Sequence, residues 1–155
     1  MKDKIIIEQV KDIESCKICN SMLSELVAYE MDFDESINPR PLIENYYEKT
    51  LNRDDSVIFI AKQGKEHAGY IMAYKQESNS KVKGNFVSIL HLYIKDNYRR
   101  LGIGRQLIEH VETWAKERFE TCFLELDCFA KNIAGLDFYS KMEFEKVRYK
   151  LRKKI

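Results

Sequence analysis

Residues that break regular structure are scarce in this sequence of 155 residues, and long apolar runs are absent from it. With 2 prolines and 6 glycines, few positions force the chain out of a helix or a strand. No apolar run approaches the length that spans a membrane, and the run Ile5-Ile6-Ile7 is too short for a secretion signal. We therefore expect a cytoplasmic protein that has no membrane partner.

The 4 cysteines do not follow the pattern of a disulfide framework or of a metal site. Cys16 and Cys19 form one C-x-x-C, but they lie within an apolar helical pattern, and no second C-x-x-C completes a zinc site. Cys122 and Cys128 are six residues apart. We expect reduced and mostly buried thiols in a reducing compartment, and no bound metal.

Charge is nearly balanced over the whole chain but unevenly divided along it. The net charge is +1, yet residues 1–60 hold 7 basic and 13 acidic residues, whereas residues 61–155 hold 19 basic and 12 acidic residues. This division indicates two ligands of opposite sign. Apolar residues make up 45% and charged residues 33%, so residues 1–155 fit a single globular domain.

Hydrophobic periodicity predicts an α/β fold with a mixed sheet. The expected strands are 5–10, 56–62, 67–76, 86–94, 122–128 and 144–151, and the expected helices are 13–29, 42–51, 103–118 and 132–142. Short turns make the strands up to residue 94 an antiparallel meander. The unit that runs from residue 86 to residue 128 is strand–helix–strand, so its two strands should be parallel.

The most informative stretch joins a strand to a helix through a basic turn. Leu90, Leu92 and Ile94 alternate as in a strand, with His91 and Tyr93 on the other face. The turn that follows has glycines that can adopt positive φ and leaves backbone N–H groups open at a helix N-terminus. Three of its residues add positive charge: Arg99, Arg100 and Arg105. These features predict a diphosphate site.

The spacing of this turn excludes two common phosphate-binding motifs. The dinucleotide fingerprint G-x-G-x-x-G fails at its third glycine, where Leu107 stands, and the Gly-Lys-Ser/Thr loop is absent. The remaining pattern, Arg-x-x-Gly-x-Gly after a strand, resembles the acetyl-CoA-binding motif of the GNAT N-acetyltransferase superfamily. Asn132, Ala134 and Phe138-Tyr139 resemble the later motif of that family. The resemblance covers about residues 86–145.

This resemblance implies a sheet that is splayed open between strands 86–94 and 122–128. The pantetheine arm of acetyl-CoA, the expected co-substrate, would enter the split and pair with backbone groups near Leu92 and Ile94. A backbone N–H near Leu92 or Tyr93 would stabilise the oxyanion. The residues that the resemblance implies at the cofactor are Leu92, Tyr93, Ile94, Arg99, Arg100, Leu101, Gly102, Ile103, Gly104, Arg105 and Asn132.

The reaction implied is direct attack by an amine on the thioester carbonyl. Carried over from the family, Tyr139 would protonate the departing CoA thiolate, since a thiol of pKa ~8.5 and a phenol of pKa ~10 can share a hydrogen bond. The base that deprotonates the amine stays open. His91 is one candidate, acting through water, although it could equally be a hydrogen-bonded histidine that faces a covering helix. Glu125, Glu30 and bulk water are the others.

The sequence says less about the acceptor amine than about the cofactor. In this family the first two helices border the acceptor site, and Glu30 and Asp32 lie in an acidic stretch there that would attract a cationic amine. A solvated acidic loop is the alternative.

Glu143 stands where the family has a glycine before phenylalanine, at a position that usually needs a left-handed backbone. The placement of Tyr139 depends on how that turn is built.

Two other functional classes remain to be weighed. Residues 146–154 include six basic residues, which suggests nucleic-acid binding. However, Val147, Tyr149 and Leu151 alternate with the charges as on a strand with one solvated face, so we expect no nucleic-acid partner. The main interpretation is an acetyltransferase that acts on a small-molecule or peptide amine. A non-catalytic CoA-binding module is the second alternative to it. The sequence leaves the acceptor and a homodimer open.

Overall fold

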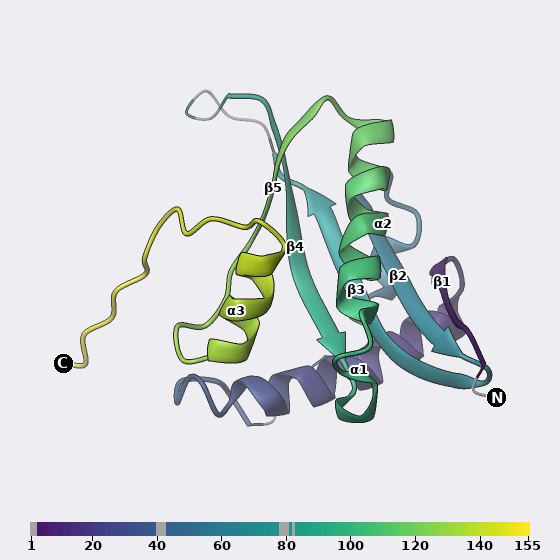
Figure 1. The fold of residues 1–155 in the computed structure, drawn as a ribbon, viewed down its shortest axis with the longest axis horizontal. Coiled ribbons are helices and arrows are strands. Elements are labelled where there is room, and N and C mark those ends of the chain that lie inside the picture. The colour runs from purple at the N-terminus through teal and green to yellow at the C-terminus, as the bar shows by residue number, and fades with distance from the viewer. Residues whose placement is uncertain (1–2, 40–42, 78–80, 82) are drawn as a thin grey trace.

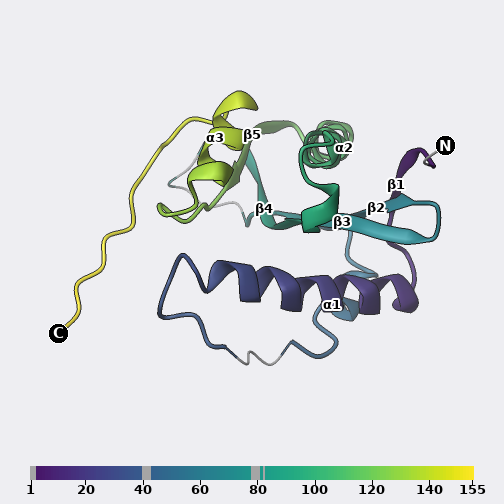
Figure 2. The same cartoon turned by 60° about the horizontal axis from the view of Figure 1, so that its bottom comes forward.

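A single mixed sheet with helices on both faces makes up the computed structural model, which describes residues 3–39, 43–77, 81 and 83–155 (Figure 1). Its helix α1 covers one face, and α2 and α3 cover the other (Figure 2). The elements in chain order are β1 (Ile5–Gln9), α1 (Ile13–Glu30), the 3₁₀ helix η1 (Glu48–Thr50), β2 (Ser56–Gln63), β3 (Glu66–Lys75), β4 (Asn85–Ile94), the 3₁₀ helix η2 (Asp96–Tyr98), α2 (Ile103–Arg118), β5 (Thr121–Leu126) and α3 (Ile133–Lys141).

The sheet has the order β1-β2-β3-β4-β5, which confirms the predicted arrangement. Strands β1 to β4 form an antiparallel meander, and β5 pairs with β4 in parallel after the α2 crossover. Among the described residues, no helix has the length and apolar character needed to cross a bilayer.

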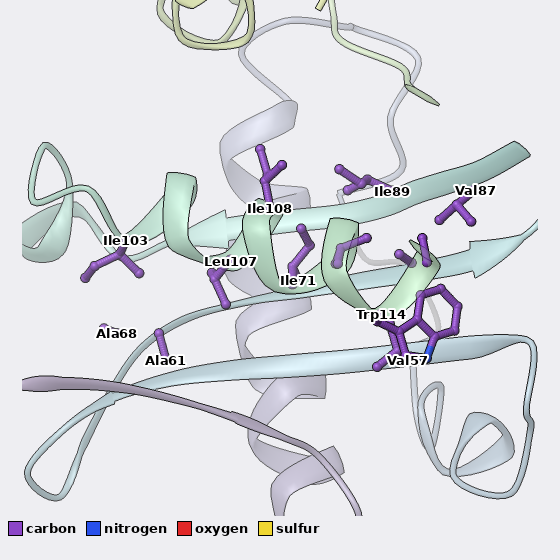
Figure 3. Close-up of a cluster of buried hydrophobic side chains, with 13 residues drawn as sticks. Val57, Ala61, Ala68, Ile71, Val87, Ile89, Ile103, Leu107, Ile108 and Trp114 are labelled. Atoms are coloured by element: carbon purple, nitrogen blue, oxygen red, sulfur yellow. The ribbon is translucent and has the colours of Figure 1, made fainter. Parts of the chain in front are cut away.

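Alternating side chains of the central strands enter two separate cores. Tyr70 and Met72 of β3 point toward α1, whereas Ile71 and Ala73 point toward α2, as the period of a strand requires. On the second face, the apolar side of α2 packs on the sheet through Ile103, Leu107, Ile108, Val111 and Trp114 (Figure 3). The two cores cover β3 on both sides, and this explains why most of its residues are buried.

A bulge in β4 decides where the sheet opens. Ile89 pairs with Ala73 and His91 pairs with Met72, so Leu90 is the extra residue, and its side chain is 43% exposed. The pairing of β4 with β5 ends at Ile89, immediately before the bulge. Because a bulge bends its strand, β4 and the chain after β5 diverge beyond this point (Figure 1). The splayed sheet that the family resemblance implied is therefore present.

The predicted helix over residues 42–51 is wrong, apart from residue 42, which lies outside the described residues. The chain forms turns followed by the short η1. Asn45 has φ +53°, a left-handed value that an α-helix cannot contain. The fully buried side chain of Tyr47 anchors this segment to the core on the α1 side of the sheet. Burial of one tyrosine thus overrides the local helical pattern.

The predicted strand over residues 144–151 is also wrong. This tail leaves the body of the molecule after α3 and has no strand partner among the described residues (Figures 1 and 2). Its alternating apolar side chains are highly exposed: Val147 is 76%, Tyr149 79% and Leu151 91% exposed. The alternation was detected correctly, but a strand also requires a neighbour that pairs with it. The polar stretch 78–85 also reads as a loop in the sequence; its residues 78–80 and 82 lie outside the described residues, and Asn85 already belongs to β4.

Candidate functional site

The turn between β4 and α2 presents unpaired backbone amides. Arg100 has φ +64° and Gly102, the N-cap of α2, has φ +76°. Among the described residues, the amides from Arg100 to Arg105 have no acceptor within the protein. The N-terminus of a helix of 16 residues adds a partial positive charge at the same place. Open amides at a helix N-terminus are the geometry of an anion cradle, and the diphosphate site that the sequence predicts at this turn stays a prediction.

The two glycines of this turn have different roles. Gly102 adopts the predicted positive φ, but Gly104 lies inside the first turn of α2 and does not. A side chain on Gly104 would place its Cβ 3.1 Å from the ring of Phe138 in α3. Gly104 therefore lets α3 approach the N-terminus of α2, which is a packing role that the local motif did not reveal.

The three arginines also differ. Arg100 and Arg105 are exposed beside the amides. Arg99 instead donates from Nε to the carbonyl oxygen of Ile94 at 3.0 Å and pairs with Asp96 at 3.0 Å. Its guanidinium carbon lies 4.6 Å from the ring centroid of Tyr29, at the end of α1. We therefore remove Arg99 from the predicted diphosphate contacts, because its side chain ties α1 to the end of β4.

Beyond the bulge, the backbone of β4 faces the gap at alternate residues. The N–H of Lys95 donates to the carbonyl oxygen of Ala68 in β3 at 2.9 Å, so the odd-numbered residues there face β3. Leu92 and Ile94 consequently direct their backbone groups into the gap. Tyr93 faces β3, so we withdraw it as an oxyanion donor and retain Leu92. The carbonyl of Ile94 already accepts from Arg99.

Helix α3, which follows β5 across the gap, has a defined cap at each end. At its start, the Oδ1 atom of Asn132 accepts from the N–H of Gly135 at 2.9 Å, so Asn132 is the N-cap. At its end, Glu143 has φ +67°, and the N–H of Phe144 donates to the carbonyl of Tyr139 at 3.0 Å. This is a Schellman turn in which glutamate occupies the glycine position. Glu143 therefore does not alter the turn that positions Tyr139.

Tyr139 lies in an aromatic environment. Its ring centroid is 5.1 Å from that of Phe138 and 5.7 Å from that of Phe144. Burial raises the pKa of the Tyr139 phenol well above its usual value, and the nearby Cys128 and Glu30 act in the same direction. The hydroxyl is therefore protonated at neutral pH, which is the state that a proton donor requires.

His91 belongs to a buried hydroxyl network on the opposite face of the sheet. The hydroxyl of Tyr47 lies 2.7 Å from Nδ1 of His91 and 2.8 Å from the hydroxyl of Tyr70. Burial lowers the pKa of His91 to about 4. No spacing in the sequence connects these residues, because Tyr47 is 44 positions from His91, so sequence reasoning missed both tyrosines.

The network has two possible proton arrangements, since Tyr47 carries one hydroxyl proton. If Tyr47 donates to Tyr70, then Nδ1 of His91 is the protonated nitrogen and Nε2 is free to accept a proton. If Tyr47 donates to His91, then Nε2 carries the proton and the imidazole cannot act as a base there. Catalysis by His91 requires the first arrangement.

The acidic candidates lie in different environments. Glu30, the last residue of α1, is half-buried, and burial raises its pKa, whereas Asp32 is exposed. Asp34 is held by Arg152 of the tail at 2.7 and 3.0 Å. Glu125 accepts from Gln76 at 2.6 Å in the paired part of β5, which leaves Glu30 as the better carboxylate candidate.

A mixed sheet that opens between two parallel strands, with open amides at the N-terminus of the helix that connects them, is the architecture of an α/β domain that can hold an anionic coenzyme. The chain matches the model of the Acetyltransferase (GNAT) family over residues 22–144. It belongs to the GNAT family, and it is an acetyl-CoA-dependent acyltransferase.

Curated relatives agree with this assignment, and a solved structure shares the fold. An N-alpha-acetyltransferase of Sulfurisphaera tokodaii is 31% identical over 124 residues, which are 72% of each chain. Streptothricin acetyltransferase A of Bacillus subtilis is 26% identical over 102 residues, 64% of this chain and 58% of that protein. Among solved structures, an aminoglycoside N-acetyltransferase in complex with CoA has TM-score 0.72 at 16% identity, covering 100% of this chain and 96% of that one.

Proposed function

We propose that this protein is an N-acetyltransferase that moves the acetyl group of acetyl-CoA to a primary amine by direct attack on the thioester. The observation that carries this proposal is the gap after the bulge at Leu90, bordered by the unpaired amides of residues 100–105. The diphosphate would bind these amides together with Arg100 and Arg105, and the pantetheine arm would pair with the backbone of Leu92. The N–H of Leu92 would also stabilise the oxyanion.

In this proposal Tyr139 protonates the departing thiolate. Its raised pKa keeps the hydroxyl protonated until negative charge builds on sulfur. A thiolate released into the same buried surroundings would also bind a proton more tightly than in water, so the two groups stay comparable. Asn132 would orient the cofactor through the part of its amide that does not cap α3.

The amine is proposed to bind near Glu30 and Asp32, and His91 is proposed to remove its proton through a water molecule. The pKa of about 4 keeps His91 uncharged at neutral pH, but it also makes the imidazole a weak base. Glu30 is the second candidate for this step, because partial burial raises the pKa of its carboxyl toward that of an amine.

The acceptor is proposed to be a small-molecule or peptide amine. The names of the relatives divide between these classes: an N-alpha-acetyltransferase on one side, and streptothricin and aminoglycoside acetyltransferases on the other. A cytoplasmic location fits the buried thiols of Cys16 and Cys19, whose pKa values burial raises to about 11 and about 12.

Release of CoA thiol from acetyl-CoA in the presence of an amine panel tests the proposed function. The panel contains an aminoglycoside, a polyamine, a peptide with a free N-terminal amine and a peptide whose only amine is a lysine side chain. We expect turnover with at least one class. CoA binding without thiol release for every amine would instead support the non-catalytic CoA-binding module.

The same assay tests the role of Tyr139. Tyr139→Phe should lower kcat by about 10²–10⁴-fold and leave the dissociation constant of CoA nearly unchanged, because only the proton donor is lost. Tyr74→Phe, in the paired part of β3, is the matched control and should retain kcat. An unchanged kcat in Tyr139→Phe would remove this residue from the mechanism without affecting the proposed activity.

A further inference from the structure

A series of side-chain contacts links the two sides of the gap in the sheet. The guanidinium carbon of Arg99, which follows β4, lies 4.6 Å from the ring centroid of Tyr29 at the end of α1. The Tyr29 ring contacts Phe33 edge to face, with the centroids 5.0 Å apart. Phe33 in turn stacks on Phe129, which follows β5, with the centroids 6.3 Å apart and 25° between the ring planes. We call the three rings of Tyr29, Phe33 and Phe129 the aromatic wall.

The aromatic wall lies on the α1 side of the gap, opposite the proposed cofactor site. The open amides belong to α2 and Tyr139 belongs to α3, and both helices cover the other face of the sheet (Figure 2). Tyr29 and Phe33 come from the last turn of α1 and the segment that follows it. An acceptor that reaches the gap from the α1 side therefore has to pass these rings.

The groups of the proposed mechanism lie next to the aromatic wall. Burial is the main cause of the raised pKa of Tyr139, and Cys128, Glu30 and Tyr29 are close enough to raise this pKa further. Cys128 directly precedes Phe129, and Glu30 is the last residue of α1. Both ends of the wall thus converge on the part of the gap where the thiolate would be protonated.

We propose that Phe33 and Phe129 determine the acceptor specificity of this enzyme, and that they select an amine at the end of an unbranched methylene chain. A lysine side chain and a linear polyamine both have this chemistry. The inference rests on the proposed acetyltransferase function and names its substrate class. Methylene groups gain by leaving water for the faces of aromatic rings, whereas the hydroxyl groups of an amino sugar would lose hydrogen bonds that the rings cannot replace.

Glu30 supplies the polar end of this route. Asp34, in the segment after α1, already accepts from both Nη atoms of Arg152, at 2.7 and 3.0 Å. Glu30 is half-buried, and burial raises the pKa of its carboxyl. An ammonium group beside Glu30 would offset this cost, because each charge favours the charged form of the other. Rings along the route and a carboxylate at its end match an alkylammonium ion better than a polyhydroxylated amine.

Steady-state kinetics with four acceptors test the substrate class. They are a peptide whose only amine is a lysine side chain, a linear polyamine, a peptide with a free N-terminal amine and an aminoglycoside. The parent protein should have its highest kcat/KM with one of the first two, and that one shows whether the source is a protein or a free amine. A higher kcat/KM with either of the last two would overturn the inference and leave the proposed function in place. No turnover with any amine would overturn both.

Substitutions in the aromatic wall test its role. In Phe33→Ala and in Phe129→Ala, the ratio of kcat/KM for the preferred alkylamine to that for the aminoglycoside should fall by about 10–100-fold, while the dissociation constant of CoA stays the same. Phe33→Tyr, which keeps the ring, should retain the ratio. Phe123→Ala is the matched control, because Phe123 also stacks on a ring, that of Phe86 at 5.0 Å, but in the paired part of β5. An unchanged ratio in both alanine variants, including an equal loss with every amine, would show a structural role alone and refute the proposal.

Discussion

Glu143 shows how a single residue can carry strain that a family usually avoids. Its φ of +67° is required by the Schellman turn that ends α3, and the two hydrogen bonds of that turn are formed. A left-handed conformation costs a residue with a side chain roughly 1–2 kcal/mol, which glycine does not lose. The turn is therefore built in the ordinary way, and the cost falls on Glu143 rather than on the position of Tyr139.

Glu143→Gly should stabilise the protein by about 1 kcal/mol and raise Tm by about 2–4 °C, because the strain is relieved while both hydrogen bonds of the turn remain. Differential scanning calorimetry measures the change. Glu145→Gly, two residues later in the exposed tail, is the control and should not raise Tm. If Glu143→Gly melts at or below the temperature of the parent protein, the strain assigned to this position does not exist.

Capping residues were predictable because their partners are close in sequence. Asp12, a residue type that favours the N-cap position, caps α1: its Oδ1 atom accepts from the N–H of Ser15 at 2.8 Å. Asn132 likewise caps α3. Arg99 was not predictable, since its ring partner Tyr29 lies on a different element. A local motif describes the bonds that a residue can make within its own turn, not those that folding brings to it.

At the scale of elements, the bulge in β4 and the turn before α2 create the gap together. The bulge changes which residues of β4 face β5, and pairing ends at Ile89. Gly102 then reverses the chain with φ +76° so that the first amides of α2 are left open. Both features depend on one strand and on the turn that follows it.

Gly102→Ala should lower the free energy of unfolding by about 1–2 kcal/mol and weaken CoA binding. Nothing lies within 4 Å of a Cβ at this position, so the cost is one of backbone conformation and not of collision. A turn that relaxes this strain would misdirect the amides. Gly64→Ala is the control for CoA binding: Gly64 has φ +59° in the β2–β3 hairpin, away from the gap, and its Cβ would also meet the carboxylate of Asp3, so stability should fall while CoA affinity should not. Calorimetric titration with CoA should show a larger dissociation constant for Gly102→Ala alone, and equal affinities would argue against the cradle.

At the scale of the whole molecule, His91 connects segments that are distant in sequence. Its hydrogen bond to Tyr47, which also bonds Tyr70 of β3, joins the segment before η1 to the sheet. Burial lowers the pKa of His91 to about 4, below the ~6.5 of a free imidazole. Between these two values, the unfolded chain binds more protons than the folded one.

The stabilising contribution of His91 to the free energy of unfolding should consequently be complete above pH ~6.5. Below that pH the free energy of unfolding should fall as the pH drops toward 4, by up to about 1.4 kcal/mol per pH unit. Urea denaturation at several pH values, for the parent protein and His91→Gln, isolates this part of the slope. His110→Gln, on the exposed side of α2, is the control. The same slope in His91→Gln as in the parent protein would show that His91 is not held uncharged in the folded state.

The tail is where the whole molecule departs most from its sequence pattern. The alternation of Val147, Tyr149 and Leu151 correctly identifies an extended segment with one apolar face. It cannot say which edge the segment joins, because pairing is a property of two strands.

The sequence by itself determined the mixed sheet, the two helix caps and the glycine turn that begins α2, because periodicity, capping and glycine conformation act over a few neighbouring residues. Only the tertiary structure decided that Arg99 binds Tyr29 and Ile94, that Tyr47 and Tyr70 surround His91, and that residues 144–151 pair with no strand among the described residues. Those contacts join residues that are far apart along the chain, and only the closing of the fold selects them.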